Sequence, residues 1–441
     1  MVILALAVAN PFSGSHAAEQ VAGQDLRTVV ARALNASPAI RAAEVDLKIA
    51  EADLARARAA RFLPRFELTW IVGPSPEARG NALLGETDLG SLSAFTRAEA
   101  TLIQPLFTFG KLKAAEDAAS GGIEARDAGL TRARHDLELK VAEAYYGLQL
   151  MDALWSLAEE ARNEISKARK TVDDALEEDT GDYTFTDLAK IDRFVYDVVE
   201  NANKVQKGRS LSVSALRMLT GQMESDTGEL APGPLKPVEI EILPIDTYLE
   251  RASTRPDLRQ LQAGIGVRAA QVRAHRSDLY PQIFLGGQLK YSYAPNRDDQ
   301  ESPFARDDFN FLHGGAVVGF RQNLSFGGTA AKVRKARLEH QKLLHLGRLA
   351  RKGAELEIEK AYRTLREAQS NMLAAEKAVK ATRRWFVSAR DGFNAGLEES
   401  GELLDAVKEY SIIRAKYHGA VFAYNRAWVS LQRATGKSLV D

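Results

Sequence analysis

Residues 358–393 read IEKAYRTLREAQSNMLAAEKAVKATRRWFVSARDGF and carry the pattern that decides the fold. Apolar or small side chains recur there at alternating steps of three and four, at Ile358, Ala361, Leu365, Ala368, Met372, Ala375, Val379, Thr382, Phe386, Ala389 and Phe393. A period of 3.5 residues keeps one face of a helix against a partner and makes the two helices coil around each other. The stretch therefore predicts one long helix of an antiparallel coiled-coil pair.

The same rhythm occurs in the following segment and in an earlier part of the chain. In the next segment, residues 407–431, the same spacing of apolar side chains is interrupted once by a charged residue, Arg414. The apolar positions are Val407, Tyr410, Tyr417, Val421, Tyr424, Trp428 and Leu431. The earlier part repeats the spacing at Leu137, Val141, Ala144, Leu148, Met151, Trp155 and Ala158. Two coiled-coil pairs are therefore predicted, and their alanines allow the helices to approach closely.

The prolines show how far these helices extend. The 14 prolines leave residues 106–231 and 304–441 without any. Proline removes a helix hydrogen bond and clashes with the preceding turn, so two such gaps, both rich in helix-forming residues, predict long helices. A helix over residues 111–176 would be about 100 Å long, which no ordinary compact core could contain.

The chain is predicted to be an internal duplication. Three local pairs recur 217 positions apart: Leu63-Pro64 with Tyr280-Pro281, Phe109-Gly110 with Phe326-Gly327, and Ala144-Tyr145 with Ala361-Tyr362. A constant offset over such a length marks a repeat. We expect a first copy at 19–231, a proline-rich linker at 232–245 and a second copy at 246–441. Each copy has the order helix, two strands, very long helix, return helix.

The first 18 residues have the character of a leader. They are uncharged apart from His16, residues 2–8 are apolar, and Ser15 and Ala17 suit the −3 and −1 positions of a cleavage site. A signal peptide at 1–18 is therefore expected, although no basic residue precedes the apolar run. A buried N-terminal helix or strand is the alternative. No later run of about 18 apolar residues follows.

Composition argues against several kinds of chemistry. The 59 basic and 59 acidic residues balance, so no nucleic-acid partner is indicated. The absence of cysteine excludes thiol nucleophiles, disulfides and thiolate metal sites. The seven histidines lack ligand spacing, and neither a phosphate-binding loop nor a nucleophile elbow is present. We expect no metal, no cofactor and no enzyme activity.

Four segments are predicted to be strands because apolar and polar residues alternate along them. Residues 282–293 place Leu285, Leu289 and Tyr291 opposite Gln288 and Lys290. Residues 315–326 alternate in the same way, and the first copy has a strand near 66–72. Its second strand, about 94–107, mixes charged and apolar residues on one face, which predicts a bulge or a shifted register.

These strands could form half-buried soluble hairpins or the wall of a transmembrane barrel. The leader and the length of about ten residues, with one aromatic-bearing apolar face, favour the barrel. About eight strands are the practical minimum for closure, so four strands per chain must be completed by other copies. Strand number alone allows two chains or three.

The arrangement resembles the TolC-like outer-membrane efflux proteins over nearly the whole mature chain. The resemblance rests on the duplicated order of elements and on motifs at both ends of each hairpin: Leu63-Pro64, Tyr280-Pro281, the run from Gln104 to Gly110, the run from Gln322 to Gly328, and Leu219-Thr220-Gly221. It implies a mainly α fold with a small β part, assembled as a homotrimer with a 12-stranded β-barrel and an α-barrel. It also implies contact with outer-membrane lipid, a periplasmic adaptor and an inner-membrane pump, in a Gram-negative bacterium.

The resemblance carries several site residues with it. In the family the turns between long helices dock the adaptor, and here Gly396 and Leu397 match the Gly-Leu step of that tip. Leu397 could equally do no more than close its own hairpin. The first turn, residues 177–185, is acidic and longer, so equivalent docking by both tips is in doubt.

Just past the second tip, Glu402 and Asp405 align with the carboxylate pair that narrows the family's channel entrance. Repeated by symmetry, they would form a ring that attracts cations. A solvated first helical turn, where acids are favoured anyway, is the alternative. Asp187 and Asp192 occupy the comparable region of the first copy. At the second tip, Phe393 and Glu398 stand at the positions where the family often has a tyrosine and an arginine that close the gate.

Two hypotheses of function follow. The first is the passive outer-membrane exit duct of a tripartite efflux or type I secretion system, with Lys290, Arg321 and Asn323 on the lumen-facing side of its strands. The second is a soluble periplasmic coiled-coil adaptor or scaffold without a pore. The cargo cannot be identified, because its selection lies mostly with the pump and adaptor.

Overall fold

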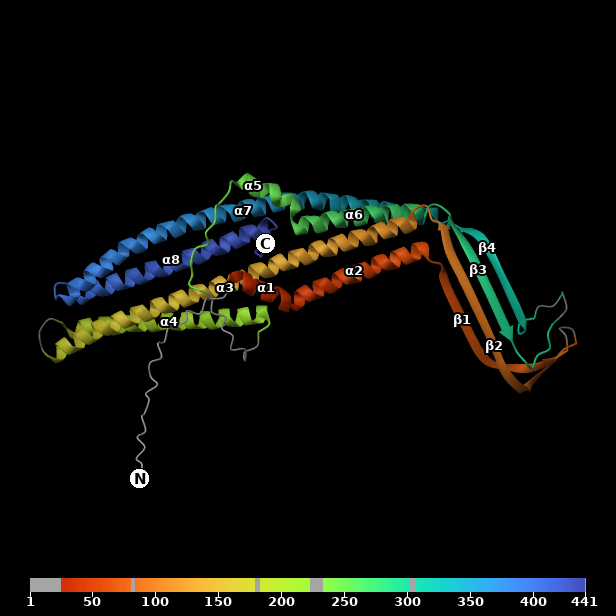
Figure 1. Ribbon diagram of the computed structural model, residues 1–441, viewed down its shortest axis with the longest axis horizontal. Coiled ribbons are helices and arrows are strands. Elements are labelled where there is room, and N and C mark those ends of the chain that lie inside the picture. The colour runs from red at the N-terminus through yellow and green to blue at the C-terminus, as the bar shows by residue number, and fades with distance from the viewer. Residues whose placement is uncertain are drawn as a thin grey trace, which may run out of the picture.

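The computed structural model describes residues 25–80, 84–178, 183–222, 233–300, 304 and 307–440 (Figure 1). The expected signal peptide lies outside them. The helices form a long, narrow body, and a four-stranded sheet leaves one end of it at an angle. The first elements in chain order are α1 Leu26–Ala36, α2 Pro38–Phe62, β1 Arg65–Arg79, β2 Glu86–Phe107, α3 Lys111–Glu177 and α4 Phe185–Thr220. They are followed by α5 Ile245–Glu250, a 3₁₀ turn Arg251–Thr254, α6 Pro256–Ser277, β3 Gln282–Tyr293, β4 Phe311–Arg321, α7 Phe326–Asn394 and α8 Ser400–Ala434.

Prolines and glycines set the helix boundaries as the sequence indicated. Pro38 occupies the first turn of α2, and the side chain of Ser37 accepts a hydrogen bond from the Ile40 amide. Pro256 opens α6 in the same way. Gly221 ends α4 at a φ of 70°, a left-handed conformation that glycine adopts without steric cost.

The two longest helices, α3 and α7, each pack along two sets of partners. Beyond the middle of the molecule α3 pairs with α4 and α7 with α8, as the coiled-coil pattern predicted, and Ile358 and Leu365 of the predicted seam are fully buried. Nearer the sheet, α2 packs on α3, α3 on α6 and α6 on α7, in one layer (Figure 1). None of the described helices is both long enough and apolar enough to cross a membrane.

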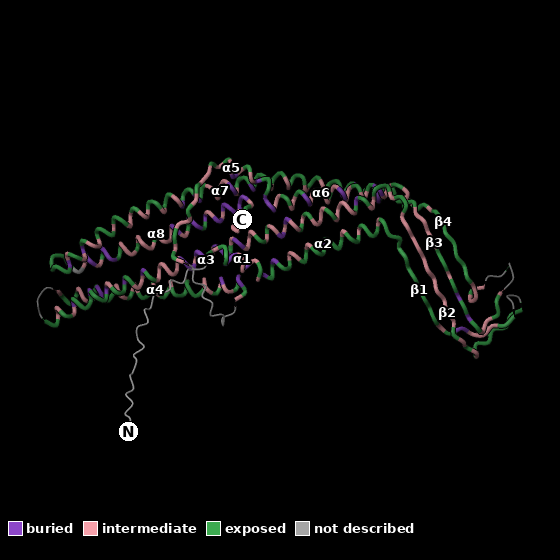
Figure 2. Tube along the Cα trace, in the orientation of Figure 1, coloured by how far each residue is buried: buried purple, intermediate pink, exposed green. Residues whose placement is uncertain are grey.

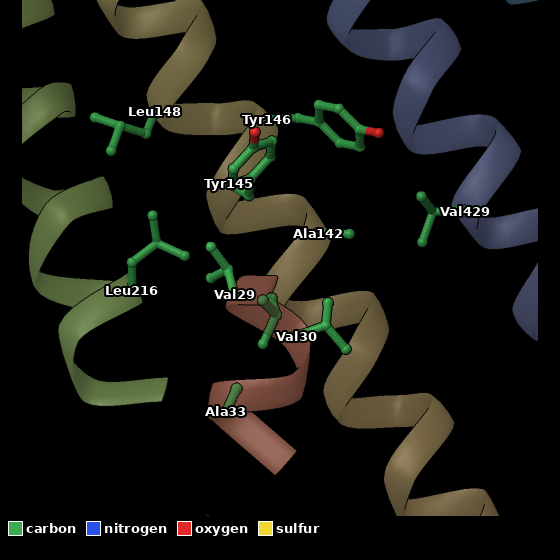
Figure 3. Close-up of a cluster of buried hydrophobic side chains, with 10 residues drawn as sticks. Val29, Val30, Ala33, Ala142, Tyr145, Tyr146, Leu148, Leu216 and Val429 are labelled. Carbon is green, nitrogen blue, oxygen red and sulfur yellow. The ribbon is translucent and has the colours of Figure 1, made fainter. Parts of the chain in front are cut away.

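Burial is confined to narrow stripes between helices and is densest near the middle (Figure 2). There α1 inserts Val29 and Val30 against Val141 of α3, Leu216 of α4 and Val429 of α8 (Figure 3). The neighbouring Tyr146 is buried, and burial raises the pKa of its hydroxyl to about 12. This cluster joins helices of both halves of the chain.

The segment 233–244 crosses the long helices as a strap between α4 and α5. The amide of Gln149 on α3 donates to the Gly233 carbonyl at 2.8 Å. Asn425 on α8 accepts from the Val238 amide at 2.9 Å and donates to the Lys236 carbonyl at 2.8 Å. The strap ends where Tyr248 of α5 packs against Ile358 and other residues of α7. It therefore ties α3, α8 and α7 together on one side of the layer.

The sheet has the antiparallel order β1-β2-β3-β4 and corrects the predicted bounds of the last strand. The last strand is Phe311–Arg321 instead of 315–326, so Asn323 lies in the connection to α7. Its side chain accepts hydrogen bonds from the backbone and hydroxyl of Ser325, which explains why this polar residue is not part of the ladder. The bulge or shifted register predicted for the strand 94–107 is present: the pairing of β2 with β3 is regular from Thr96 to Pro105 and shifts between Pro105 and Phe107, and the pairing with β1 shifts between Pro76 and Glu77.

A charge network around the buried side chain of Arg255 closes the middle of the molecule. The guanidinium of Arg255 donates to Asp257 at 2.8 Å, to Glu357 of α7 at 2.6 Å and to the Ala434 carbonyl at the end of α8 at 2.9 Å. Arg433 connects the same Glu357 to Asp136 of α3. The side chain of Arg255 is buried, whereas those of Asp257 and Glu357 are partly exposed, so the loss of Arg255 would leave the Ala434 carbonyl without its donor while water can still reach the two carboxylates.

We predict that Arg255→Met lowers the free energy of unfolding by about 2 kcal/mol, since it leaves the Ala434 carbonyl without its donor and removes the hydrogen bonds to Asp257 and Glu357. Arg268→Met is the matched control. Its pair with Glu339 is exposed and contributes about 1 kcal/mol or less. Thermal unfolding of the helices, followed by circular dichroism, measures both. Equal losses in the two variants would contradict the special role of the network around Arg255.

Candidate functional site

The turn between α7 and α8 is a compact tip held by its own backbone. Gly396 adopts a φ of 70°, its amide donates to the Phe393 carbonyl, and the Leu397 amide donates to the Gly392 carbonyl at 2.9 Å. These two bonds form a Schellman motif, in which an apolar residue at the Leu397 position usually packs on the residue at position 392. Here that residue is glycine, so Leu397 has no such contact and its side chain is 83% exposed.

Phe393 takes the opposite position from Leu397, although it is only four residues away. Its side chain is 3% exposed and belongs to a cluster with Ile165 of α3, Ile191 of α4 and Leu403 of α8. The Tyr183 ring lies 5.5 Å from the Phe393 ring. Phe393 therefore holds the two helix hairpins together, whereas Glu398 lies across Gly392 in the exposed turn.

Glu402 and Asp405 lie on an exposed face of the first turns of α8. The indole nitrogen of Trp385 on α7 donates to Glu402 Oε1 at 2.8 Å, which fixes that carboxylate beside the tip. The neighbouring Leu403 and Ala406 are buried, so the helix cannot rotate the acids away without exposing apolar surface. The role of Trp385 is not evident from the sequence, where its position beside the predicted seam residue Phe386 is the one signal of it.

The acids of copy one are engaged within their own hairpin. Asp187 completes a capping box at the start of α4: it accepts from the Thr184 amide at 3.1 Å and hydroxyl at 2.7 Å. Asp192 binds Arg169 of α3 at 2.8 Å, and this hydrogen bond raises the pKa of Arg169. The turn residues 179–182 lie outside the described part of the chain.

Arg414, the charged interruption in the predicted seam, joins the two halves above the tip. Its guanidinium pairs with Glu160 of α3 and lies 5.3 Å from the Tyr410 ring, which stacks on Phe386. Burial alone would lower the pKa of Arg414, but the hydrogen bond to Glu160 outweighs burial and raises it. A charge inside an apolar seam is explained here by a partner on a third helix, which spacing along one helix cannot show.

The sheet separates its apolar and polar side chains on two faces. Directly paired residues share a face, and one face exposes Phe66, Leu68, Trp70, Val72, Leu289, Tyr291, Leu312, Val318 and Phe320. The other face carries Lys290, which binds Glu99 at 3.0 Å, and Arg321 near the helix end. Lys290 and Arg321 therefore lie on the same face but far apart, because Lys290 pairs with His313 and Arg321 with Gln282, whereas Asn323 lies outside the sheet. Among the described residues, no group of acids and histidines could hold a metal ion.

A sheet that is apolar on one face and polar on the other, continued by helices far longer than a compact core, defines the class of outer-membrane channel-tunnels. The sequence pattern of the outer membrane efflux protein family matches residues 29–222 and 249–437. The chain belongs to this family. It is accordingly a channel-tunnel for tripartite efflux in the outer membrane of a Gram-negative bacterium, with its helices in the periplasm.

Solved structures of such channels share the fold. The OprN outer-membrane channel is 19% identical, with a TM-score of 0.78 over 94% of this chain and 91% of that one. The Campylobacter jejuni CmeC channel is 17% identical, with a TM-score of 0.77 over 99% and 94%. The open state of the Neisseria gonorrhoeae MtrE channel is 18% identical, with a TM-score of 0.75 over 94% and 89%. No curated protein sequence matches this chain.

We predict that Phe393→Ala destabilises the tips of both hairpins by about 3 kcal/mol, because it empties a buried site shared by four helices. Leu397→Ala, four residues away, changes stability by about 0.5 kcal/mol or less because the side chain is exposed. Amide hydrogen exchange over residues 165–172, 186–195 and 388–410 distinguishes the two variants, since only Phe393→Ala should speed exchange in all three segments. Faster exchange confined to the α7–α8 hairpin would contradict the shared core.

Proposed function

We propose that three copies of this chain form one passive duct, through which an inner-membrane pump exports cargo with the help of a periplasmic adaptor. The proposal is supported above all by the sheet, whose edge strands β1 and β4 each have one neighbour within the described chain. Open edges beside an apolar outer face would aggregate or leave backbone groups unsatisfied in lipid. Three copies give a closed ring of twelve strands.

The helical layer supports the same assembly. Its edge helices, α2 and α7, expose apolar residues away from their own partners: Val45 and Ile49 on α2, and Leu338, Leu349 and Leu356 on α7. Joined edge to edge, they would bury these side chains in seams like those within the chain. The two copies at 19–231 and 246–441, joined by the linker 232–245, remain a prediction that the repeated order of elements supports.

The tip residues receive roles within this duct. Leu397, exposed on a rigid turn, is the apolar contact offered to the adaptor, and Gly396 provides the left-handed step that presents it. Glu402 and Asp405 form a carboxylate ring at the entrance, whereas Asp187 contributes mainly by capping α4. Lys290 and Arg321 face the water-filled lumen of the barrel. No catalytic step is part of this function.

Cell fractionation tests the duct against the soluble scaffold. We predict recovery in the outer membrane as an oligomer that runs as a trimer on gels at low temperature and as a monomer after heating. A ring of backbone hydrogen bonds between copies resists detergent, so heating is needed to separate them. Recovery in the soluble periplasm as a monomer would refute the proposal.

For the entrance, we predict that Glu402→Ala combined with Asp405→Ala lowers the cation preference of single channels by at least threefold, because six carboxylates leave the ring of a trimer. Glu359→Ala combined with Glu376→Ala removes the same charge from α7 farther from the tip and is the control. Planar-bilayer reversal potentials under a salt gradient measure the preference. Unchanged selectivity in the first variant would remove the pair from the gate.

A further inference from the structure

A cavity lies at the middle of the molecule, where the strap, the start of α6 and the end of α8 come together (Figure 1). Its volume is about 610 Å³. Its walls come from α1, α3, the strap, α5, the 3₁₀ turn, α6, α8 and residues 436–439 that follow α8. A volume of this size is typical of sites that bind small organic molecules.

The cavity belongs to the centre of one chain. No residue of α2, α4 or α7 lines it. Helices α2 and α7 are the edges along which the copies of the proposed duct would join beside the sheet, and α4 packs mainly on α3 at the corresponding edge of the tip half. A neighbouring copy that joins along these edges therefore leaves the cavity open.

The lining of the cavity is rich in positive charge. Glu241 of the strap is its one acid, against four basic side chains from four segments, Arg27, Arg251, Arg259 and Lys437. Arg259 also reaches Asp127 of α3 at 3.4 Å, whereas the other three cations form no ion pair with any described residue. Setting Glu241 and Asp127 against the four cations leaves two positive charges.

The lining also offers neutral hydrogen-bond donors that are not used. Gln432 is only 8% exposed, yet its side-chain amide has no hydrogen-bond partner among the described residues. The indole N–H of Trp428 and the imidazole of His135 are likewise unbonded within the described chain. The Tyr248 hydroxyl, in contrast, already accepts from the Leu243 amide at 3.3 Å. A buried amide without a partner costs free energy, which a ligand with acceptor oxygens would recover.

Apolar side chains form another part of the wall. Trp428 of α8, Leu243 of the strap and Leu439 after α8 line the same cavity. The cavity has room for on the order of 20 water molecules, so a bare inorganic ion would fill only a small part of it. The arrangement fits a molecule with a charged head and an apolar body.

The position of the cavity indicates where such a molecule comes from. Thr131, on the wall formed by α3, lies 20 residues after the start of that helix beside the sheet, or about 30 Å along its axis. The outer membrane surrounds the sheet, so its lipid headgroups do not extend to this depth. The ligand is therefore dissolved in the periplasm.

We propose that this cavity binds a soluble organic phosphate monoester. A phosphate monoester carries close to two negative charges at pH 7 and three strong acceptor oxygens, which match the two uncompensated charges and the free donors. Arg27 and Arg251 bind the phosphate, because arginine presents a fork of donors suited to it. The apolar body packs on Trp428. The site goes beyond the export function and lies within a single chain, so it does not depend on the trimer.

Isothermal titration of phenyl phosphate into the purified full-length protein tests the proposal. Arg27→Gln combined with Arg251→Gln is expected to raise the Kd about tenfold or more, because two charge-assisted contacts are lost. The matched control, Arg337→Gln combined with Arg348→Gln, removes two exposed arginines of α7 that do not line the cavity. Its Kd is expected to stay within about twofold of the unchanged protein, because charges so far away are screened.

A third variant is expected to gain affinity, which a folding defect could not produce. Glu241→Gln removes the acid from the lining and is expected to lower the Kd about twofold or more, since the repulsion of the phosphate is lost. Inorganic phosphate is expected to bind about tenfold more weakly than phenyl phosphate, because it lacks the apolar body. Phenol, which lacks the charge, is expected not to bind.

Four results would each overturn the proposal: no binding of phenyl phosphate, an unchanged Kd in the double variant of the cavity, weaker binding by Glu241→Gln, or equal affinity for inorganic phosphate, which would mean an adventitious ion only. The heat-sensitive trimer is measured separately on gels. A protein that binds phenyl phosphate as expected but forms no trimer would refute the proposed duct and support the cavity. An intact trimer without binding would do the reverse.

Discussion

The structure depends on one constraint: the helices form a layer only one helix thick, so each apolar stripe must be covered by the helix beside it. A compact domain can bury such stripes in a common centre, but this chain has only seams. The seam of α7 begins against α6 and ends against α8, and the seam of α3 passes from α2 and α6 to α4. A layer of this kind always ends in two uncovered edges, which in this chain are α2 and α7 beside the sheet.

The same constraint explains what the sequence could predict. The heptad positions, the proline-free lengths and the strand 282–293 were predicted correctly, because each depends on a local period or on the chemistry of one residue. The position of Asn323 and the start of β4 were not, since the local hydrogen bonds between Asn323 and Ser325 and the pairing of Phe311 with Ser292 cannot be derived from alternation along one segment. The second partner of each long helix was also missed, because an apolar stripe does not say which helix covers it.

The candidate site divides along similar lines. The exposure of Leu397 follows from a glycine at 392, which the sequence shows. The burial of Phe393 depends on three other helices and could not be derived from the turn alone. Asp187 and Glu402 occupy similar places in their hairpins, yet the first is used in a capping box and the second is held by Trp385. The two hairpins are built from similar helices but use the acidic side chains at their ends in different ways.

The strap has a mechanical consequence for the duct. It fastens α7 near Leu365, and the helix continues 29 residues farther to Asn394, a lever of about 44 Å. A tilt of about 10° around that fastening would displace the tip by about 8 Å while the layer beside the sheet stayed in place. The strap therefore lies where the fulcrum of such a tilt would be, and a small angular change at the middle would be amplified at the tip.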